Sequence, residues 1–189
     1  RNYHRQYHLE PFKLPGAEAA IRKPARIALS LLWQCDIPWD EQLQPVNAFS
    51  STELEAVASQ LVKNLNAPMT TSMGRLFDGI SALIGICPEI SYEAQAAMEL
   101  QAVVDLDETG CYEMPIAGTQ LLLGPLISAI YMDLKHNVPK PKIAARFHNT
   151  LVETCLKISQ EASKIYGTKV IALSGGVWQN KLLFEKTLC

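Results

Sequence analysis

A glycine turn between an apolar run and a polar pair is the stretch of this sequence most suited to chemistry. Residues 172–183 read ALSGGVWQNKLL, so the apolar run stops at two adjacent glycines. Glycine has no Cβ, and its backbone N–H groups can therefore approach an anion closely. The start of a following helix would add further N–H donors. The pattern predicts a buried strand over 169–173, a turn and a helix from about residue 181, which together could hold a phosphate group.

The polar residues of the turn leave two interpretations open. Asn180 could cap the helix or point its amide at a ligand, and Gln179 is long enough to reach a ribose or a phosphate. Many strand-to-helix turns contain two glycines and bind nothing. The spacing also matches neither the Walker pattern nor G-x-G-x-x-G. Spacing alone therefore does not decide between ligand binding and a structural turn.

Composition narrows the class of protein. The chain has 189 residues, of which 48% are apolar and 19% charged, with a net charge of −2. These values are ordinary for a globular protein and give no electrostatic reason to expect nucleic-acid or membrane binding. The five cysteines include no Cys-x-x-Cys pair. We therefore expect reduced thiols in a cytoplasmic protein.

Apolar residues that recur three and four positions apart predict a mainly helical chain. Thr52 and Glu55 have the spacing of a capping box, and residues 138–141 are interpreted as a linker. One short strand is expected over 111–116. The helices are expected over residues 24–33, 52–65, 73–84, 92–103, 125–136 and 142–166, and from about 181.

Five segments resemble, in the same order, the HypF family of carbamoyltransferases that mature nickel–iron hydrogenases. They are residues 11–29, 71–85, 92–100, 145–151 and 172–183. The resemblance implies an α/β, predominantly helical fragment: one lobe of an actin-like ATPase fold with a helical insertion. It places a linking segment and the insertion in 1–118, and the nucleotide-side lobe, truncated at its C-terminal end, in 119–189. The first lobe and the other domains of such an enzyme are expected outside this sequence.

The resemblance also implies an activity. The family's enzyme is expected to use carbamoyl phosphate and ATP, to form carbamoyl adenylate, and to pass the carbamoyl group to the C-terminal cysteine of a HypE-like maturation protein. That group would later be dehydrated to the cyanide ligand of the hydrogenase iron. The attacking thiol would belong to the partner, and this chain alone is expected to be inactive.

The resemblance assigns nucleotide contacts by position. The residues of the turn itself are the stronger assignments, and its flanking side chains and an earlier glycine are weaker. Where the family has a second glycine after that earlier one, this sequence has Ala17. The assigned residues are Gly175, Gly176, Asn180, Ser174, Gln179 and Gly16.

A metal ion, zinc or iron, is implied for the complete domain, with its ligands mostly outside this sequence. His4 and His8 have the spacing of a helical metal pair, but the family's histidine pair should precede Arg1. We therefore expect these two histidines to be solvated and assign no metal ligand within the chain.

Several polar residues on predicted helices have two interpretations each. Arg75 and Asp78 could form a surface ion pair, or contact carbamoyl adenylate or the other lobe. His148 could pack within its helix bundle or face the nucleotide cleft. Glu93 and Gln95 lie near a helix start, where Glu is favoured by the helix dipole alone, and Glu99 follows on the same helix.

Two other functions remain alternatives. One is a tRNA threonylcarbamoyl transferase-like protein, against which the weak basic balance argues. The other is a non-catalytic module whose helical insertion docks the maturation partner. Titration with ATP analogues would separate the docking module from the carbamoyltransferase.

Overall fold

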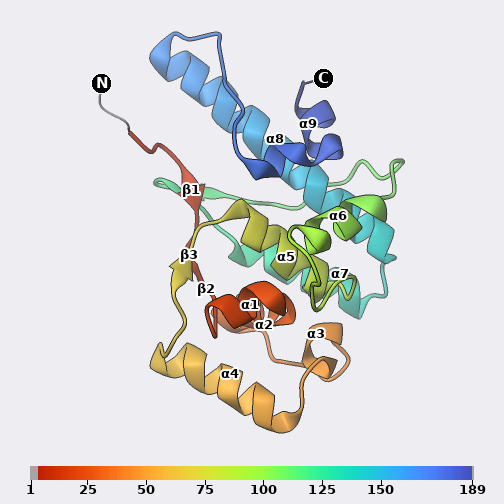
Figure 1. Cartoon of the computed structure of the whole chain (residues 1–189). Helices are drawn as coiled ribbons and strands as arrows, with labels where there is room; N and C mark the ends of the chain where they lie inside the picture. The colour runs from red at the N-terminus through yellow and green to blue at the C-terminus, as the bar shows by residue number, and fades with distance from the viewer. Residues whose placement is uncertain (1–3, 189) are drawn as a thin grey trace.

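Helices dominate the computed structural model, which describes residues 4–188 (Figure 1). The described segment contains nine α-helices and one 3₁₀ turn, η1 (Gly176–Gln179). The α-helices are α1 (Glu18–Arg22), α2 (Ala25–Gln34), α3 (Gln44–Asn47), α4 (Ser51–Lys63), α5 (Met73–Leu83), α6 (Gln95–Ala102), α7 (Gly124–Lys135), α8 (Lys140–Tyr166) and α9 (Lys181–Leu188).

Five two-residue strands tie distant parts of the chain together. Strand β1 runs parallel to β5, and β5 pairs antiparallel with β4, with His8 opposite Gln120. A second, antiparallel pair joins β2 to β3, with Phe12 opposite Thr70. The strands are β1 (His8–Leu9), β2 (Phe12–Lys13), β3 (Met69–Thr70), β4 (Ile116–Ala117) and β5 (Gln120–Leu121).

The core is centred on the packing of α2 against α5. A Cβ added to Gly79 would lie 2.8 Å from Cγ2 of Ile27 and 2.9 Å from Cδ1 of Leu31. Any side chain at position 79 would therefore force Ile27 and Leu31 to shift, and glycine allows the two helices to approach this closely without that shift. Phe77 on α5 and Phe147 on α8 extend the same core, with ring centroids 5.0 Å apart in an edge-to-face arrangement.

Helix α8 begins earlier than predicted and is buried along only part of its length. Pro139 is its N-cap and Pro141 lies in its first turn, where the missing N–H has no helical partner to lose. The linker interpretation of 138–141 is therefore wrong for its last two residues. The far end of α8 projects away from the other helices (Figure 1), and Ile165 is 54% exposed. Gly167, at φ 63°, ends the helix as predicted.

The capping box of α4 lies two residues before the predicted one. Ser50 accepts a hydrogen bond from the Glu53 backbone, and the Glu53 carboxylate accepts one from the Ser50 N–H at 2.8 Å. Thr52 and Glu55 instead lie inside the first turns of the helix. The apolar residues of this helix are not all buried: Val57 and Leu61 are 0% exposed, whereas Val62 is 70% exposed.

The region between α5 and α7 is less regular than predicted. Helix α6 starts at Gln95, three residues late, because Ala94 adopts the left-handed region at φ 63°. The predicted strand over 111–116 is confirmed only at Ile116, in β4. Residues 105–115 are held instead by side chains, including Tyr112, whose hydroxyl donates to Asp133 at 2.7 Å.

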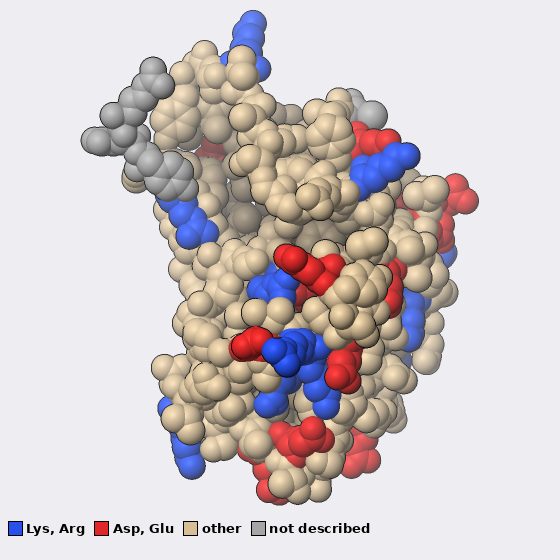
Figure 2. Space-filling model, viewed as in Figure 1, with Lys and Arg blue, Asp and Glu red and all other residues tan. Residues whose placement is uncertain are grey.

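Positive and negative side chains lie close together in the lower half of the face shown in Figure 2, and in the upper half the charged side chains lie mainly towards the edges. Within the described residues, no helix combines the length and the apolar character that crossing a membrane requires.

Candidate functional site

The glycine turn is an open and exposed bend between α8 and α9. Gly175 has φ 96° and ψ 160° and precedes η1, a backbone conformation that side chains other than glycine rarely adopt. No backbone or side-chain partner among residues 4–188 accepts a hydrogen bond from the amide of Gly175 or Gly176. A Cβ added at either glycine would meet nothing within 4 Å. Two N–H donors are thus free to bind an anion from outside.

The strand predicted before the turn is absent. Residues 169–173 have no assigned strand, and Val170 is 81% exposed and Ile171 50% exposed. The prediction rested on β-forming side chains, but a strand also needs a neighbouring strand, and no described strand pairs with this segment. The segment descends beside α8 towards η1 (Figure 1).

Packing against other elements fixes the turn. Val177 and Trp178 are partly buried against the core, and η1 contacts both α5 and α9. Helix α9 begins at Lys181 as predicted. The glycines therefore lie at the start of the 3₁₀ turn η1, and not at the first turn of α9.

Asn180 caps α9 and also bonds to a buried histidine. Its Oδ1 accepts from the Leu183 N–H at 2.9 Å, and its Nδ2 lies 3.0 Å from Nε2 of His148. Of the two interpretations of Asn180, the capping one is therefore confirmed. The side chain is occupied within the protein and shapes the turn.

His148 is a packed core residue and not an exposed cleft residue. It is 0% exposed and stands edge-on to Phe77, with ring centroids 5.4 Å apart. Burial lowers the pKa of His148 to about 4, partly offset by the Ala144 carbonyl. The ring is accordingly neutral at pH 7, with Nδ1 bonded to Ala144 O at 2.7 Å.

Arg75 and Asp78 form an ion pair, but the aspartate is not at the surface. The Nη1–Oδ2 distance is 2.9 Å, and the Asp78 side chain is 2% exposed. Arg75 Nη1 and Asp78 Oδ2 are close enough for an ion pair, but they are not aligned as a hydrogen bond. Within the described segment, neither atom has a hydrogen-bond partner. Burial raises the pKa of Asp78 to about 6 although Arg75 opposes the shift. Contact with a ligand or another lobe stays a prediction.

The other assigned residues are distributed unevenly. Ser174 and Gln179 are exposed beside the glycines. Gly16 lies elsewhere, between β2 and α1, and its amide donates to Asn66 O at 2.8 Å. In Figure 1, α1 and α9 lie on different sides of α5. The structure therefore brings together five of the six assigned residues and leaves Gly16 apart.

The polar residues of α6 bond to one another. Gln95 accepts from the Ser91 N–H at 2.7 Å and donates to Glu99 at 2.8 Å. Glu93 is exposed in the turn before the helix. These contacts give Gln95 and Glu99 a structural role, which is to stabilise the start of α6.

Three of the four described cysteines are poorly suited to act as nucleophiles, and the described residues form no metal-ligand group. Burial raises the pKa of Cys35 and Cys87 to about 11 and also raises that of Cys155. Among residues 4–188, no group of three or more His, Cys, Asp or Glu side chains is placed to hold a metal ion. His8 lies in β1 and not on a helix, with Nδ1 2.8 Å from the carbonyl of Leu9. Cys189 lies outside the described residues.

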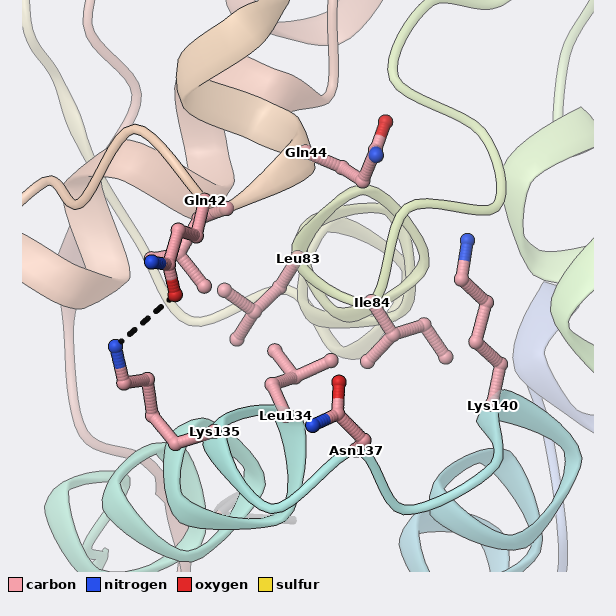
Figure 3. A pocket seen from close by; sticks show the side chains of 9 residues that line it. Gln42, Gln44, Leu83, Ile84, Leu134, Lys135, Asn137 and Lys140 are labelled. Carbon is pink, nitrogen blue, oxygen red and sulfur yellow. Dashed lines mark hydrogen bonds between the residues drawn. The ribbon is translucent and has the colours of Figure 1, made fainter.

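A separate hollow of about 220 Å³ opens between α3, α5, α7 and α8 (Figure 3). Its floor is apolar, and its rim carries Lys135 and Lys140. Both lysines already have partners, because Lys135 donates to Asp40 and Lys140 to Gly85 O. This hollow contains none of the assigned residues.

The contact between His148 and Asn180 was missed from sequence. The two residues were considered separately, and 32 positions separate them. The sequence contains no local pattern that pairs His148 with Asn180, because the packing of α9 on α8 brings the two residues together. Asn149 was also missed: its Oδ1 accepts from Lys186 of α9 at 2.7 Å, beside the same contact.

Comparison with known proteins gives a consistent result. Residues 1–188 match the family model described as "Carbamoyltransferase, Kae1-like Domain, second subdomain". Carbamoyltransferase HypF of Synechocystis sp. is 36% identical over 96% of this chain and 25% of its own length. Probable carbamoyltransferase HypF of Methanocaldococcus jannaschii is 33% identical over 96% of this chain and 24% of its own length. The chain thus spans about a quarter of these relatives.

Solved structures are similar over the whole chain. A crystal structure of full-length HypF in the phosphate- and nucleotide-bound form superposes with a TM-score of 0.86 at 32% identity, covering 100% of this chain and 30% of that one. HypF of T. kodakarensis superposes with a TM-score of 0.78 at 22% identity, covering 97% of this chain and 26% of that one, which supports the fold alone.

Proposed function

The chain belongs to the HypF carbamoyltransferase family, and from this premise we propose that it forms the nucleotide-side lobe of an enzyme that uses ATP and carbamoyl phosphate. Its fold is one lobe of an actin-like ATPase fold, predominantly helical with small sheets. The two-part division at residue 118 remains a prediction.

The proposed reaction transfers a carbamoyl group in three steps. Water cleaves carbamoyl phosphate to carbamate and phosphate, and the carbamate oxygen then attacks the α-phosphorus of ATP, so that pyrophosphate leaves and carbamoyl adenylate, a mixed anhydride, is formed. The thiolate of the C-terminal cysteine of a HypE-like partner then attacks the carbonyl carbon, the bond to the phosphate oxygen breaks, and AMP leaves with the electron pair. Dehydration of the resulting thiocarbamate would supply the cyanide ligand of a nickel–iron hydrogenase.

The two unpartnered amides of the glycine turn are the observation that carries the proposal. Gly175 and Gly176 present N–H donors that bond to nothing else among residues 4–188. Fixed donors of this kind stabilise the charge that develops on a leaving phosphate. The full-length relative with 32% identity was solved in a phosphate- and nucleotide-bound form, which supports a phosphate as the anion.

The remaining residues of the turn have secondary roles in the proposal. Ser174 and Gln179 are exposed beside the glycines and could reach a phosphate or a ribose. Asn180 acts by shaping the turn, because its side chain caps α9. The described residues do not supply a metal-ligand set. We therefore assign no step of the proposed carbamoyl transfer to the zinc or iron ion that is implied for the complete domain.

Replacing Gly176 by proline tests the role of its amide. Gly176 is the first residue of η1, where proline fits the backbone and removes the N–H donor. A lost hydrogen bond to a charged phosphate costs about 1.5–3 kcal/mol, so we expect Gly176→Pro to weaken binding of a non-hydrolysable ATP analogue about tenfold to hundredfold. The measurement is calorimetric titration of the full-length natural protein.

Gly176→Ala is the matched variant, because it keeps the N–H and its methyl group would meet nothing within 4 Å in the protein. We expect it to bind more tightly than Gly176→Pro. Equal affinity of the proline variant and the parent would refute a phosphate contact at this amide. Absence of binding in the parent itself would favour the docking module.

A further inference from the structure

A chain of hydrogen bonds runs from the core helix α8 to the first turn of α9. The Ala144 carbonyl can only accept, so Nδ1 of His148 must carry the proton that forms the 2.7 Å bond. Nε2 then has a lone pair and accepts from Nδ2 of Asn180 at 3.0 Å. That contact leaves Oδ1 of Asn180 to accept from the Leu183 N–H at 2.9 Å. One tautomer of the histidine thus sets the orientation of the amide.

Aromatic packing holds the histidine ring in place. The rings of Phe77 and Phe147 stand edge-on to it, with centroid distances of 5.4 and 5.8 Å. Phe77 belongs to α5, which also contacts η1. The ring therefore connects the core helices α5 and α8 to the segment that follows the two glycines.

We propose that His148 is a positioning residue for the glycine turn, which it holds through the side chain of Asn180. Without the acceptor at Nε2, the amide of Asn180 loses its only described partner other than the α9 backbone and can rotate. Packing of Val177 and Trp178 still anchors η1, but residues 175–180 are held less tightly and the two glycine amides lose part of their fixed arrangement. The consequence for nucleotide binding rests on the proposed function of the turn.

The immediate charged neighbour supports the neutral ring. Lys186 of α9 donates to Asn149 beside His148, and its charge disfavours a protonated ring. A protonated ring would place a second donor opposite Nδ2 of Asn180 and break the contact.

Three variants of the full-length natural protein test the proposal. His148→Phe keeps a planar ring between the two phenylalanines but has no acceptor. His148→Gln places an amide at the level of Nε2 and can restore the acceptor. Thr154→Val is the control, because Thr154 is buried on the same helix and its hydroxyl donates only to Thr150 O at 2.8 Å.

We expect His148→Phe to weaken binding of the ATP analogue about three- to tenfold, the effect of one lost hydrogen bond. It should also speed hydrogen–deuterium exchange in a peptide spanning 172–183. His148→Gln should lie close to the parent in both measurements, and Thr154→Val should match it. The proposal is overturned if His148→Phe behaves as the parent, or if His148→Gln is impaired as strongly as His148→Phe.

The two proposals fail separately. If the parent binds no ATP analogue, the proposed function is wrong, and exchange in 172–183 alone decides the role of His148. Faster exchange in His148→Phe that His148→Gln reverses would then still support positioning, and unchanged exchange would refute it.

Discussion

Two buried ionisable residues on the core helices are held towards their neutral forms. Burial lowers the pKa of His148 to about 4 and raises that of Asp78 to about 6. His148 therefore lowers stability as the pH falls from 6.5 towards 4, because only the unfolded chain takes up its proton. Asp78 has the opposite effect, because the folded chain keeps its proton to a higher pH. The two contributions partly cancel in mildly acidic solution.

Asp78→Asn should separate these contributions. The pKa of Asp78 rises from 3.8 to about 6 on folding, so the folded state binds more protons in this interval and the aspartate costs more stability as the pH rises. Relative to the parent, we expect the variant to gain about 1.4 kcal/mol per pH unit between about pH 4 and 6. Urea unfolding at a series of pH values measures this.

Ser81→Ala, on the same helix, is the control for Asp78→Asn. Ser81 is fully buried and does not titrate, so its stability difference from the parent should not change with pH. A pH-independent difference for Asp78→Asn would show that the carboxyl group is not destabilised by burial.

Ala94 adopts a backbone conformation that suits glycine better. Its φ of 63° lies in the left-handed region, which costs a residue with a Cβ about 1–2 kcal/mol. Glycine loses about 0.5–1 kcal/mol more than alanine through lost chain freedom. We therefore expect Ala94→Gly to stabilise the protein by about 0.5–1 kcal/mol in urea unfolding. Ala97→Gly, inside α6, should instead destabilise by about 1 kcal/mol; destabilisation by Ala94→Gly would contradict this account.

At the scale of elements, the sequence predicts what depends on local pattern. Helices α2, α5, α7 and α9 begin within about two residues of their expected starts, because an apolar stripe and a cap or proline act within one segment. The prediction of a strand over 169–173 was wrong, because a strand forms only beside a partner strand and local sequence pattern does not reveal that partner. The five clustered residues of the turn are adjacent in sequence, whereas the His148 contact depends on the packing of α8 and α9.

The start of α4 offers a direct test of local pattern against structure. Ser50 and Glu53 form the capping box, and loss of such a cap costs about 1 kcal/mol. We expect Ser50→Ala to lower the free energy of unfolding by about 1 kcal/mol and Thr52→Ala to change it by less than about 0.5 kcal/mol. Thermal and urea unfolding measure both. A larger loss of unfolding free energy in Thr52→Ala than in Ser50→Ala would instead identify Thr52 as the cap.

At the scale of the whole molecule, one core links both ends of the described chain. Its buried members run from Leu9 in β1 to Leu183 in α9, and β1 pairs with β5 more than 100 residues later in sequence. The charges are mixed over the face in Figure 2, and the net charge is −2. Under the proposed function, we therefore expect a phosphate to be bound by the local N–H donors of the turn and not by a net positive charge of the lobe.

The activity is expected to require more than this lobe. The chain spans about a quarter of the curated relatives it matches. A nucleotide held by one wall of a cleft loses contact area and remains open to water. With ATP, carbamoyl phosphate and a HypE-like partner, we expect the 189-residue chain to leave the partner cysteine unmodified. Mass spectrometry of the partner would show a carbamoyl adduct if this expectation were wrong.

The central claim is that the amides of Gly175 and Gly176 hold a phosphate. A crystal structure of the full-length natural protein with a non-hydrolysable ATP analogue tests it most directly. We predict a phosphate oxygen within about 3.2 Å of each amide nitrogen, the ordinary N–H to O distance. A nucleotide bound with its phosphates beyond hydrogen-bond reach of both amides would contradict the account.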